Sequence, residues 1–376
     1  MYYEMLHHME SMLQFVAAVT VDEKTAYAVS CKFNGLFKID LQTEKCEFIQ
    51  LFPDLDVYGS WLFFSAVKGG KDIYFSPSSA DYIAKYDIGE NKIHKIALPE
   101  SDRPYAGNNY RLGDAFYARG HVYFVCATRG GILKLEESTG KISVIVTDTQ
   151  DEVFFRRGIL VDDTYYVPSS NSPVIMEYRL QTDEIILHQI EGEGGAWSIW
   201  GDGENFWLPP REQNDPIRCW NKSTGETSMV GIQVPGYRPV DMSFLKIFNS
   251  GNCLIVSPEC ANMFLRIDIQ TGRAEPFDIA CAKDVAERYG YFFETAKDLY
   301  FAAYVSGQEN IYFKIEKDTL AVKQVHFTLQ NSDSFLKAVG SELKIPNDVV
   351  MENETNNLEE FIAMVQLLPR RREEQA

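Results

Sequence analysis

The apolar residues of this chain come in short runs that recur in the same order seven times. Each repeat holds an aromatic-rich strand, a polar turn, an alternating strand such as YIAKYDI at 82–88, a second polar turn and a last strand. The first aromatic strands align, 41 to 49 residues apart, at Tyr27, Tyr74, Tyr123, Tyr166, Trp207, Leu254 and Tyr300. A period of this length built from short strands predicts the blade of a β-propeller.

Another apolar strand precedes each repeat, as in WLFFSAVKG at 61–69, and gives every blade an inner strand. The turns between strands are rich in Gly, Asp and Asn, which adopt the positive φ that tight hairpins need. We therefore predict an all-β, seven-bladed propeller of four-stranded antiparallel blades over residues 1–329, followed by a helical tail over 330–376. The blades are expected at about 12–52, 60–98, 112–147, 155–190, 195–231, 242–277 and 290–329.

The ring explains how these sheets bury themselves. A four-stranded sheet with two apolar faces cannot cover both alone, whereas radial packing of seven covers all of them and leaves short edges. Both end blades hold four strands of their own, so the ring needs no exchanged strand to close. Residues 2–6 or the tail could still clasp the seam between the first and last blades.

The blade pattern carries a resemblance. An aromatic pair, a Ser/Pro turn, a strand of the type I-x-K-Y-D and a T-G-K turn make residues 12–329 resemble the streptogramin-lyase-like propellers. In that family a histidine on the top face and a magnesium ion are implicated in a ring-opening elimination. This chain offers no matching histidine, so the resemblance implies the architecture and transfers no catalytic residue.

Charge and cysteine content narrow the partners and the location. The formal net charge of −18 argues against nucleic acid and anionic membrane as partners, because both require a basic surface. The N-terminal sequence lacks the features of a signal peptide, and no apolar stretch is long enough to span a membrane. Seven cysteines without a C-x-x-C spacing indicate reduced thiols and a cytoplasmic protein.

Arginine and aromatic residues gather in the loops that a propeller places on its top face, where the inner strands begin. Lysines fall mostly in the bottom turns. The planar guanidinium group binds carboxylate or phosphate through two hydrogen bonds and stacks on aromatic rings. We therefore expect a ligand site at the channel mouth, formed by Arg111, Arg129, Arg156, Arg157, Arg211, Arg238, Arg288, Tyr58, Trp61, Tyr110, Trp197 and Tyr237. The alternative is that these arginines pair with nearby acids such as Asp114 and Asp241.

Catalytic signals are weak. The histidines fall in the N-terminal segment, on outer strands or in a bottom turn, and no metal-ligand spacing or cofactor motif is present, so we expect neither a metal nor a cofactor. Cys126 beside Arg129 could be a nucleophile, although a buried inert thiol fits better. Asp114, Asp241 and Glu259 could serve as acid or base, but the sequence pairs none of them.

These observations predict a recognition module that captures an anionic small molecule, peptide or glycan, or a protein partner, at the top mouth. Two alternatives stay open. The protein could be a lyase or hydrolase that acts on a peptide or carbohydrate at the same mouth. It could instead be a scaffold that uses an amphipathic helix over residues 358–368 of the tail.

Overall fold

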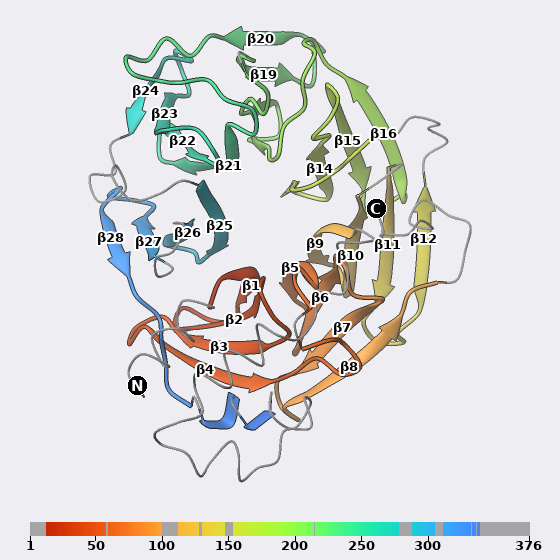
Figure 1. The fold of residues 1–376 in the computed structure, drawn as a ribbon. Helices are drawn as coiled ribbons and strands as arrows, with labels where there is room; N and C mark the ends of the chain where they lie inside the picture. The colour runs from red at the N-terminus through yellow and green to blue at the C-terminus, as the bar shows by residue number, and fades with distance from the viewer. Residues whose placement is uncertain are drawn as a thin grey trace, which may run out of the picture.

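The computed structural model confirms the predicted ring of seven antiparallel sheets (Figure 1). It describes residues 13–57, 59–99, 112–127, 130–146, 153–213, 215–277, 288–304, 311–331, 333–335 and 337–338, and the side chains of residues 288, 289, 291, 292 and 304 are not described. Each blade runs from an inner strand at the central axis to an outer strand at the rim, in chain order. The inner strand β1 contacts both β5 and β25, so the first blade touches the second and the seventh.

The first four blades comprise sixteen strands. They are β1 (Phe15–Thr20), β2 (Thr25–Ser30), β3 (Leu36–Asp40), β4 (Lys45–Gln50), β5 (Phe63–Lys68), β6 (Asp72–Pro77), β7 (Tyr82–Asp87), β8 (Lys92–Ala97), β9 (Leu112–Ala118), β10 (His121–Cys126), β11 (Gly131–Glu136), β12 (Ile142–Val146), β13 (Ile159–Val161), β14 (Thr164–Pro168), β15 (Val174–Arg179) and β16 (Glu184–Gln189).

The last three blades comprise twelve strands, and one short strand follows them. They are β17 (Trp200–Gly201), β18 (Asn205–Leu208), β19 (Ile217–Asn221), β20 (Thr227–Val230), β21 (Phe244–Ser250), β22 (Cys253–Pro258), β23 (Phe264–Asp268), β24 (Ala274–Phe277), β25 (Arg288–Glu294), β26 (Asp298–Tyr304), β27 (Ile311–Glu316), β28 (Val322–Val325) and β29 (Thr328–Leu329).

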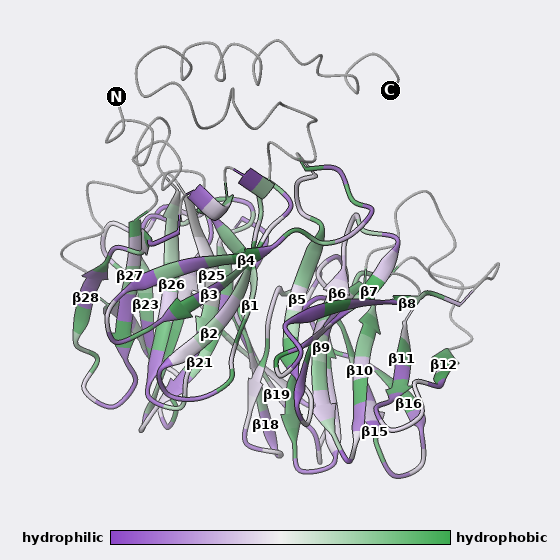
Figure 2. Ribbon diagram, turned by 90° about the horizontal axis from the view of Figure 1, so that it is seen from below, coloured by the Kyte–Doolittle hydropathy of each residue, from purple (hydrophilic) through white to green (hydrophobic). Residues whose placement is uncertain are grey.

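The repeated aromatic positions explain why the blades pack. All seven aligned residues lie on the second strand of their blade and are at most 5% exposed: Tyr27, Tyr74, Tyr123, Tyr166, Trp207, Leu254 and Tyr300. The second strands are buried almost throughout, because each is covered by neighbouring blades on both faces. Figure 2 shows the ring from the side, with hydrophobic stretches along strands such as β10.

The chain after the seventh blade closes the ring. It runs from β28 to the outer edge of the first blade, where β29 pairs in parallel with β4 (Figure 1). Residues 328–329, which the repeat pattern assigns to the seventh blade, thus form a fifth strand on the first. The reason is geometric: β4 is an edge strand with free backbone groups, and Thr328 and Gln330 donate hydrogen bonds to the carbonyls of Glu44 and Cys46.

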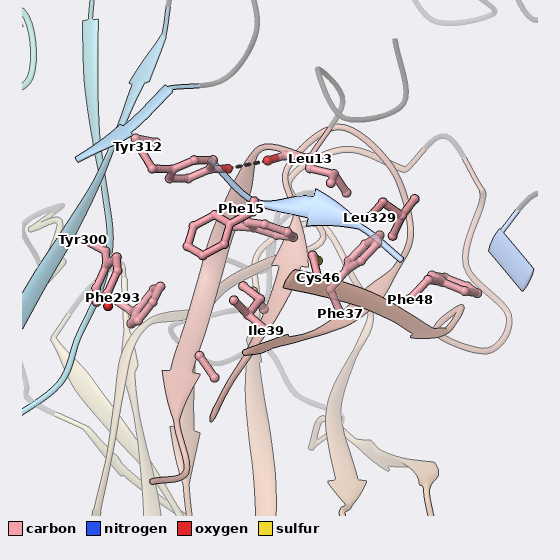
Figure 3. Packing of buried hydrophobic residues seen from close by; sticks show 14 of the residues in the cluster. Leu13, Phe15, Phe37, Ile39, Cys46, Phe48, Phe293, Tyr300, Tyr312 and Leu329 are labelled. Atoms are coloured by element: carbon pink, nitrogen blue, oxygen red, sulfur yellow. Dashed lines mark hydrogen bonds between the residues drawn. The ribbon is translucent and has the colours of Figure 1, made fainter. Parts of the chain in front are cut away.

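One apolar cluster spans this seam (Figure 3). Phe15 and Phe37 of the first blade pack at 5.5 Å between ring centroids, and Phe15 also lies 6.2 Å from Tyr312 of the seventh blade. The hydroxyl of Tyr312 donates a hydrogen bond to the backbone carbonyl of Leu13, before the first strand. Residues from both ends of the chain therefore share one core.

Beyond the blades, a short helical segment at residues 333–335 brings Phe335 into the seam cluster. The predicted tail helix over 358–368 and the N-terminal residues 2–6 lie outside the described residues. None of the helical segments that the structure does describe has the length and hydrophobicity needed to cross a membrane.

Candidate functional site

Arg156 and Arg157 lie in the segment that leads into β13, on the face where the inner strands begin. This segment is fixed by its neighbours rather than by a strand of its own. Phe155 is fully buried, forms an isolated bridge with Ser169, and donates its N–H to the carbonyl of Ala127 in the preceding blade. The two arginines that follow are therefore presented from a firmly held backbone.

Asp114 of β9 holds the same segment from the other side. Its N–H donates to the carbonyl of Arg156, and its carboxylate accepts hydrogen bonds from Gly158 N–H at 3.2 Å and the hydroxyl of Tyr165 at 3.0 Å. A Cβ at Gly113 would lie 2.9 Å from the carbonyl oxygen of Phe155, so only glycine permits this close approach. Asp114 is thus a structural carboxylate that positions the arginines.

Trp197 lies in the segment that leads into β17 of the next blade. Both of its neighbours are buried and hydrogen-bonded to other blades. Ala196 donates its N–H to Ser169, and the hydroxyl of Ser198 accepts the N–H of Ile247. Because it lies between two anchored residues, the indole has little freedom to move with the backbone.

Arg211 follows β18 and also lies close to the ring of Trp197. Its Nη1 donates to the carbonyl of Ser170 at 2.8 Å and to Oε1 of Glu212 at 2.9 Å. Its own carbonyl accepts the N–H of Ser243, at the start of the sixth blade. The expected pairing with a local acid therefore occurs for Arg211, but the partner carboxylate is 43% exposed and the pair is weakly stabilising.

These segments bring three guanidinium groups and two rings together. The guanidinium carbons of Arg156 and Arg211 lie 5.3 and 5.5 Å from the ring centre of Trp197. Those of Arg157 and Arg156 lie 4.9 and 5.8 Å from the ring of Phe64. We call these five residues the arginine–tryptophan cluster. Stacking of this kind holds a guanidinium in place while leaving its N–H groups available at the edge.

Two donors in the cluster are buried without an acceptor. Nε1 of Trp197 and Nε of Arg211 have almost no accessible surface, and neither donates a hydrogen bond within the part of the chain that the structure describes. A buried donor that makes no hydrogen bond is costly, and each such group needs an explanation. Because neither nitrogen is accessible in this conformation, a ligand oxygen would accept from them only after the neighbouring side chains move.

Phe64 belongs to the cluster but is absent from the sequence-based set. It is the bulged residue of β5, because the pairing with β6 shifts register between Phe63 and Ser65. A bulge redirects a side chain that strict alternation would place on the sheet face. The adjacent pair Phe63–Phe64 breaks the alternation of apolar and polar residues along this strand. In the sequence, that break was the signal for a bulge at Phe64.

The other predicted ligand residues are placed elsewhere or are not described. Trp61 is 49% exposed before β5, and Tyr237 stacks on Phe244 at 6.0 Å beside a separate pocket. Arg238 is exposed on that same loop, where its N–H donates to Asn262. Arg288 begins β25, but its side chain is not described. Four further members lie outside the described residues: Arg111, Arg129, Tyr58 and Tyr110.

Trp61 has a backbone φ of 53°, which is unusual for a bulky residue. Met242 has a φ of 52° at the corresponding position of the sixth blade, two residues before a phenylalanine that begins the inner strand. Because the conformation recurs, it reflects how a chain enters a blade. It therefore does not mark Trp61 as a ligand contact.

The side chains that the sequence offered for acid–base or nucleophilic chemistry, Cys126, Asp114, Asp241 and Glu259, are hydrogen-bonded or buried. Cys126 is fully buried, and burial raises the pKa of its thiol to about 12, which keeps it neutral. Asp241 accepts the N–H of Gln213, and His188 bonds Glu177 on the outer part of the fourth blade. Among the described residues, no three His, Cys, Asp or Glu side chains are grouped as a metal site would require.

Comparison with known proteins supports the architecture. No protein-family model matches the chain, and no curated protein sequence matches it. Virginiamycin B lyase from Staphylococcus aureus superposes with a TM-score of 0.60 at 17% identity, covering 80% of this chain and 94% of its own. A streptogramin B lyase gives a TM-score of 0.60 at 16% identity, covering 82% and 93%.

A third similar structure is YCF48 bound to a D1 peptide, with a TM-score of 0.56 at 11% identity, covering 84% of this chain and 93% of that one. Identities this low establish the fold alone. Together with the ring of seven antiparallel sheets, they show that this chain has the streptogramin-lyase-like seven-bladed propeller architecture.

Proposed function

We propose that this protein is a recognition module that binds an anionic, partly apolar ligand at the arginine–tryptophan cluster, and that the ligand is a peptide with a free carboxylate. The observation that carries the proposal is the convergence of Arg156, Arg157 and Arg211 on Trp197 and Phe64. Although the chain has a net charge of −18, these three arginines concentrate positive charge at one point, and this charge favours the binding of an anion there.

The chemistry of the cluster favours a carboxylate over a metal or a cation. All of its unfilled polar groups are donors, and a carboxylate offers two oxygens that can accept from a guanidinium fork and from an indole N–H at once. The two rings supply an apolar surface beside those donors. A peptide that ends in a carboxylate next to an apolar side chain matches both parts.

The similar structures are compatible with this class of ligand. YCF48, which shares the architecture, has been seen with a peptide bound, and two other similar structures are lyases. The enzymatic alternative places a lyase or hydrolase reaction at the same mouth. It requires a proton-transferring or nucleophilic side chain within hydrogen-bond reach of the ligand, and the cluster itself consists of arginines and aromatic rings.

The test is a screen of immobilised peptides with free C-termini, followed by titration of the strongest binders as the acid and as the C-terminal amide. We expect amidation to weaken binding about tenfold or more, because a charge-assisted pair is lost. The double variant Arg156→Ala/Arg211→Ala should lose binding, and Arg119→Ala should not. Arg119 is a matched control, since it pairs with Asp163 in a bottom turn.

The proposal is refuted if acids and amides bind equally well, or if the double variant binds like the parent protein. Recovery of a chemically altered peptide after incubation would favour the enzymatic alternative. Circular dichroism of both variants checks that any loss of binding is local.

A further inference from the structure

A second concave site lies where a loop within the fifth blade meets the loop between the fifth and sixth blades. It has a volume of about 490 Å³ and is bordered by two segments, residues 215–216 after β18 and residues 231–239 after β20. Its lining is mixed: prolines, aliphatic side chains and the ring of Tyr237 lie beside polar groups, among them the carboxylate of Asp215. Pockets of this size and composition are typical of small-ligand sites.

The wall formed by residues 231–239 is preformed. Val234 and Tyr237 close a tight turn through the N–H of Tyr237 and the carbonyl of Val234, with Gly236 at a φ of 81°. Proline followed by glycine is the preferred centre of such a turn. Asn262 holds the loop from outside by donating to Gly236 and accepting from Arg238. A ligand would therefore meet a wall that needs little ordering.

Asp215 supplies the one charge in the lining of this pocket. Its Oδ2 is buried and accepts no hydrogen bond from the described residues. A Cβ on Gly194 would lie 1.9 Å from this oxygen, so glycine at that position makes room for the carboxylate. Burial raises the pKa of Asp215, despite the attraction of Arg218. The carboxylate is therefore incompletely satisfied by the described residues, and it borders a pocket that combines apolar and polar surface.

Arg218 does not satisfy this carboxylate. Its side chain is almost fully buried, and its Nη1 and Nη2 donate to the carbonyls of Gly194 and Gly195 at 2.7 and 2.9 Å. The guanidinium therefore supports the loop that leads to Trp197 and makes no direct ion pair with Asp215 among the interactions of the described residues. Its charge acts on the carboxylate only from a distance.

We propose that this pocket binds an alkylammonium group, with the ammonium at Asp215 and the aliphatic stem against the proline and valine walls. The ring of Tyr237 adds a cation–π surface to the same pocket. A lysine side chain of a peptide supplies this chemistry, and so does a free amine. The negative net charge of the chain favours the approach of a cation to this site.

The pocket and the arginine–tryptophan cluster are joined by one residue. Glu212 pairs with Arg211 of the cluster, and its carbonyl accepts the N–H of Asp215. The loop after β18 therefore contributes Arg211 to the site for an anion and, four residues later, Asp215 to the site for a cation. The alkylammonium site goes beyond the proposed function and does not depend on it.

The probe is acetyl-Gly-Lys-Gly-amide, which has no free carboxylate and so makes no use of the arginine cluster. Ligand-observed NMR titration compares it with the norleucine analogue, which keeps the stem and lacks the ammonium, and with n-butylammonium. We expect the lysine peptide to bind about tenfold more tightly than the norleucine peptide. Arg119→Ala, which removes a cation from a bottom turn, should leave this binding unchanged.

Two variants test the carboxylate. Asp215→Asn removes the negative charge of the carboxylate. Gln233→Lys places a positive charge, which repels an ammonium group, at an exposed residue of the pocket lining. Both variants should lower the affinity for the lysine peptide about tenfold. Asp318→Asn, in an exposed bottom turn, should leave this affinity unchanged. Equal binding of the lysine and norleucine peptides, or unchanged binding in Gln233→Lys, would overturn the proposal. If butylammonium binds as tightly as the peptide, the site is supported, and a free amine rather than a peptide lysine is its ligand.

Discussion

Phe335 gives the sharpest stability prediction, because it packs the segment that follows the seventh blade against the first blade. It is 8% exposed and packs on Phe33 and Phe48 of the first blade, with ring centroids 5.0 and 5.2 Å away. Asn331 supports it by donating to the carbonyl of Phe48 and accepting the Phe48 N–H, both at 2.8 Å. The change to test is Phe335→Ala.

The expected cost follows from the burial. Truncation of a buried phenylalanine to alanine costs about 3–5 kcal/mol, and the lower end applies because this site lies where water can enter after truncation. The free energy of unfolding should therefore fall by about 3 kcal/mol. With a urea m-value of about 3 kcal/mol/M for a domain of this size, the midpoint should move down by about 1 M.

The assay is equilibrium unfolding in urea, followed by tryptophan fluorescence and by circular dichroism. Lys337→Ala is the matched control, since it is exposed in the same short segment and should change stability by less than about 0.5 kcal/mol. If Phe335→Ala shifts the midpoint no more than Lys337→Ala does, the chain end contributes nothing to ring closure. That result would refute the reasoning.

Two further predictions concern the fourth and fifth blades. Burial would raise the pKa of Glu177, but hydrogen bonds from Arg179 and His188 and the charge of Lys222 outweigh it and hold the pKa below its usual value. The ionised Glu177 therefore stabilises the folded state above about pH 4.3, and this contribution is lost as the pH falls through the folded-state pKa. In urea unfolding, Glu177→Gln should lower the free energy of unfolding by about 2 kcal/mol at pH 7 and by progressively less towards pH 3. A constant difference across that range would contradict it. Gly195→Ala would place a Cβ 2.2 Å from the carbonyl carbon of Ser170, whose oxygen binds Arg211, so peptide-acid binding at the cluster should weaken about tenfold. Gly231→Ala, with no atom within 4 Å of its new Cβ, is the control in the same titration, and equal binding by the two variants would disprove the role of Gly195.

The blade count and the strand order could be predicted from sequence because both depend on local patterns. Strand periodicity, turn residues and a buried aromatic in each second strand are all readable along the chain. The pairing of β29 with β4 joins Thr328 to Lys45, and no local pattern specifies it. It depends on where the seventh blade ends in space, which is known only once the ring is built.

The site was predictable only in part, for the same reason. Arg156, Arg157, Arg211 and Trp197 belong to loops that topology places on one face, so their shared location followed from the fold. Phe64 joins them because of a bulge. The Asp215 pocket depends on two loops about twenty residues apart, and on Gly194 making room for a carboxylate. Such contacts between loops have no periodic signature.

The seven repeats also provide an internal control that separates charges required by the fold from charges that are not. Lysine faces the aligned second-strand residue at Lys38, Lys85, Lys134 and Lys314, each in its own blade. In the fourth blade Glu177 takes that position opposite Tyr166, and Lys222 of the next blade restores the cation by contacting both.

The fifth and sixth blades have Cys219 and Ile267 at this position, so the lysine is a recurrent feature of the blades and not a requirement of every one. The arginine–tryptophan cluster has no such recurrence: strand pairing aligns Phe155 with Phe15, so the first blade has Val16 and Ala17 where the fourth has Arg156 and Arg157. The ring closes at its other blades without a guanidinium at that position. The propeller fold therefore does not require three arginines at one point of the mouth. This is the physical reason to assign them a role in binding a ligand.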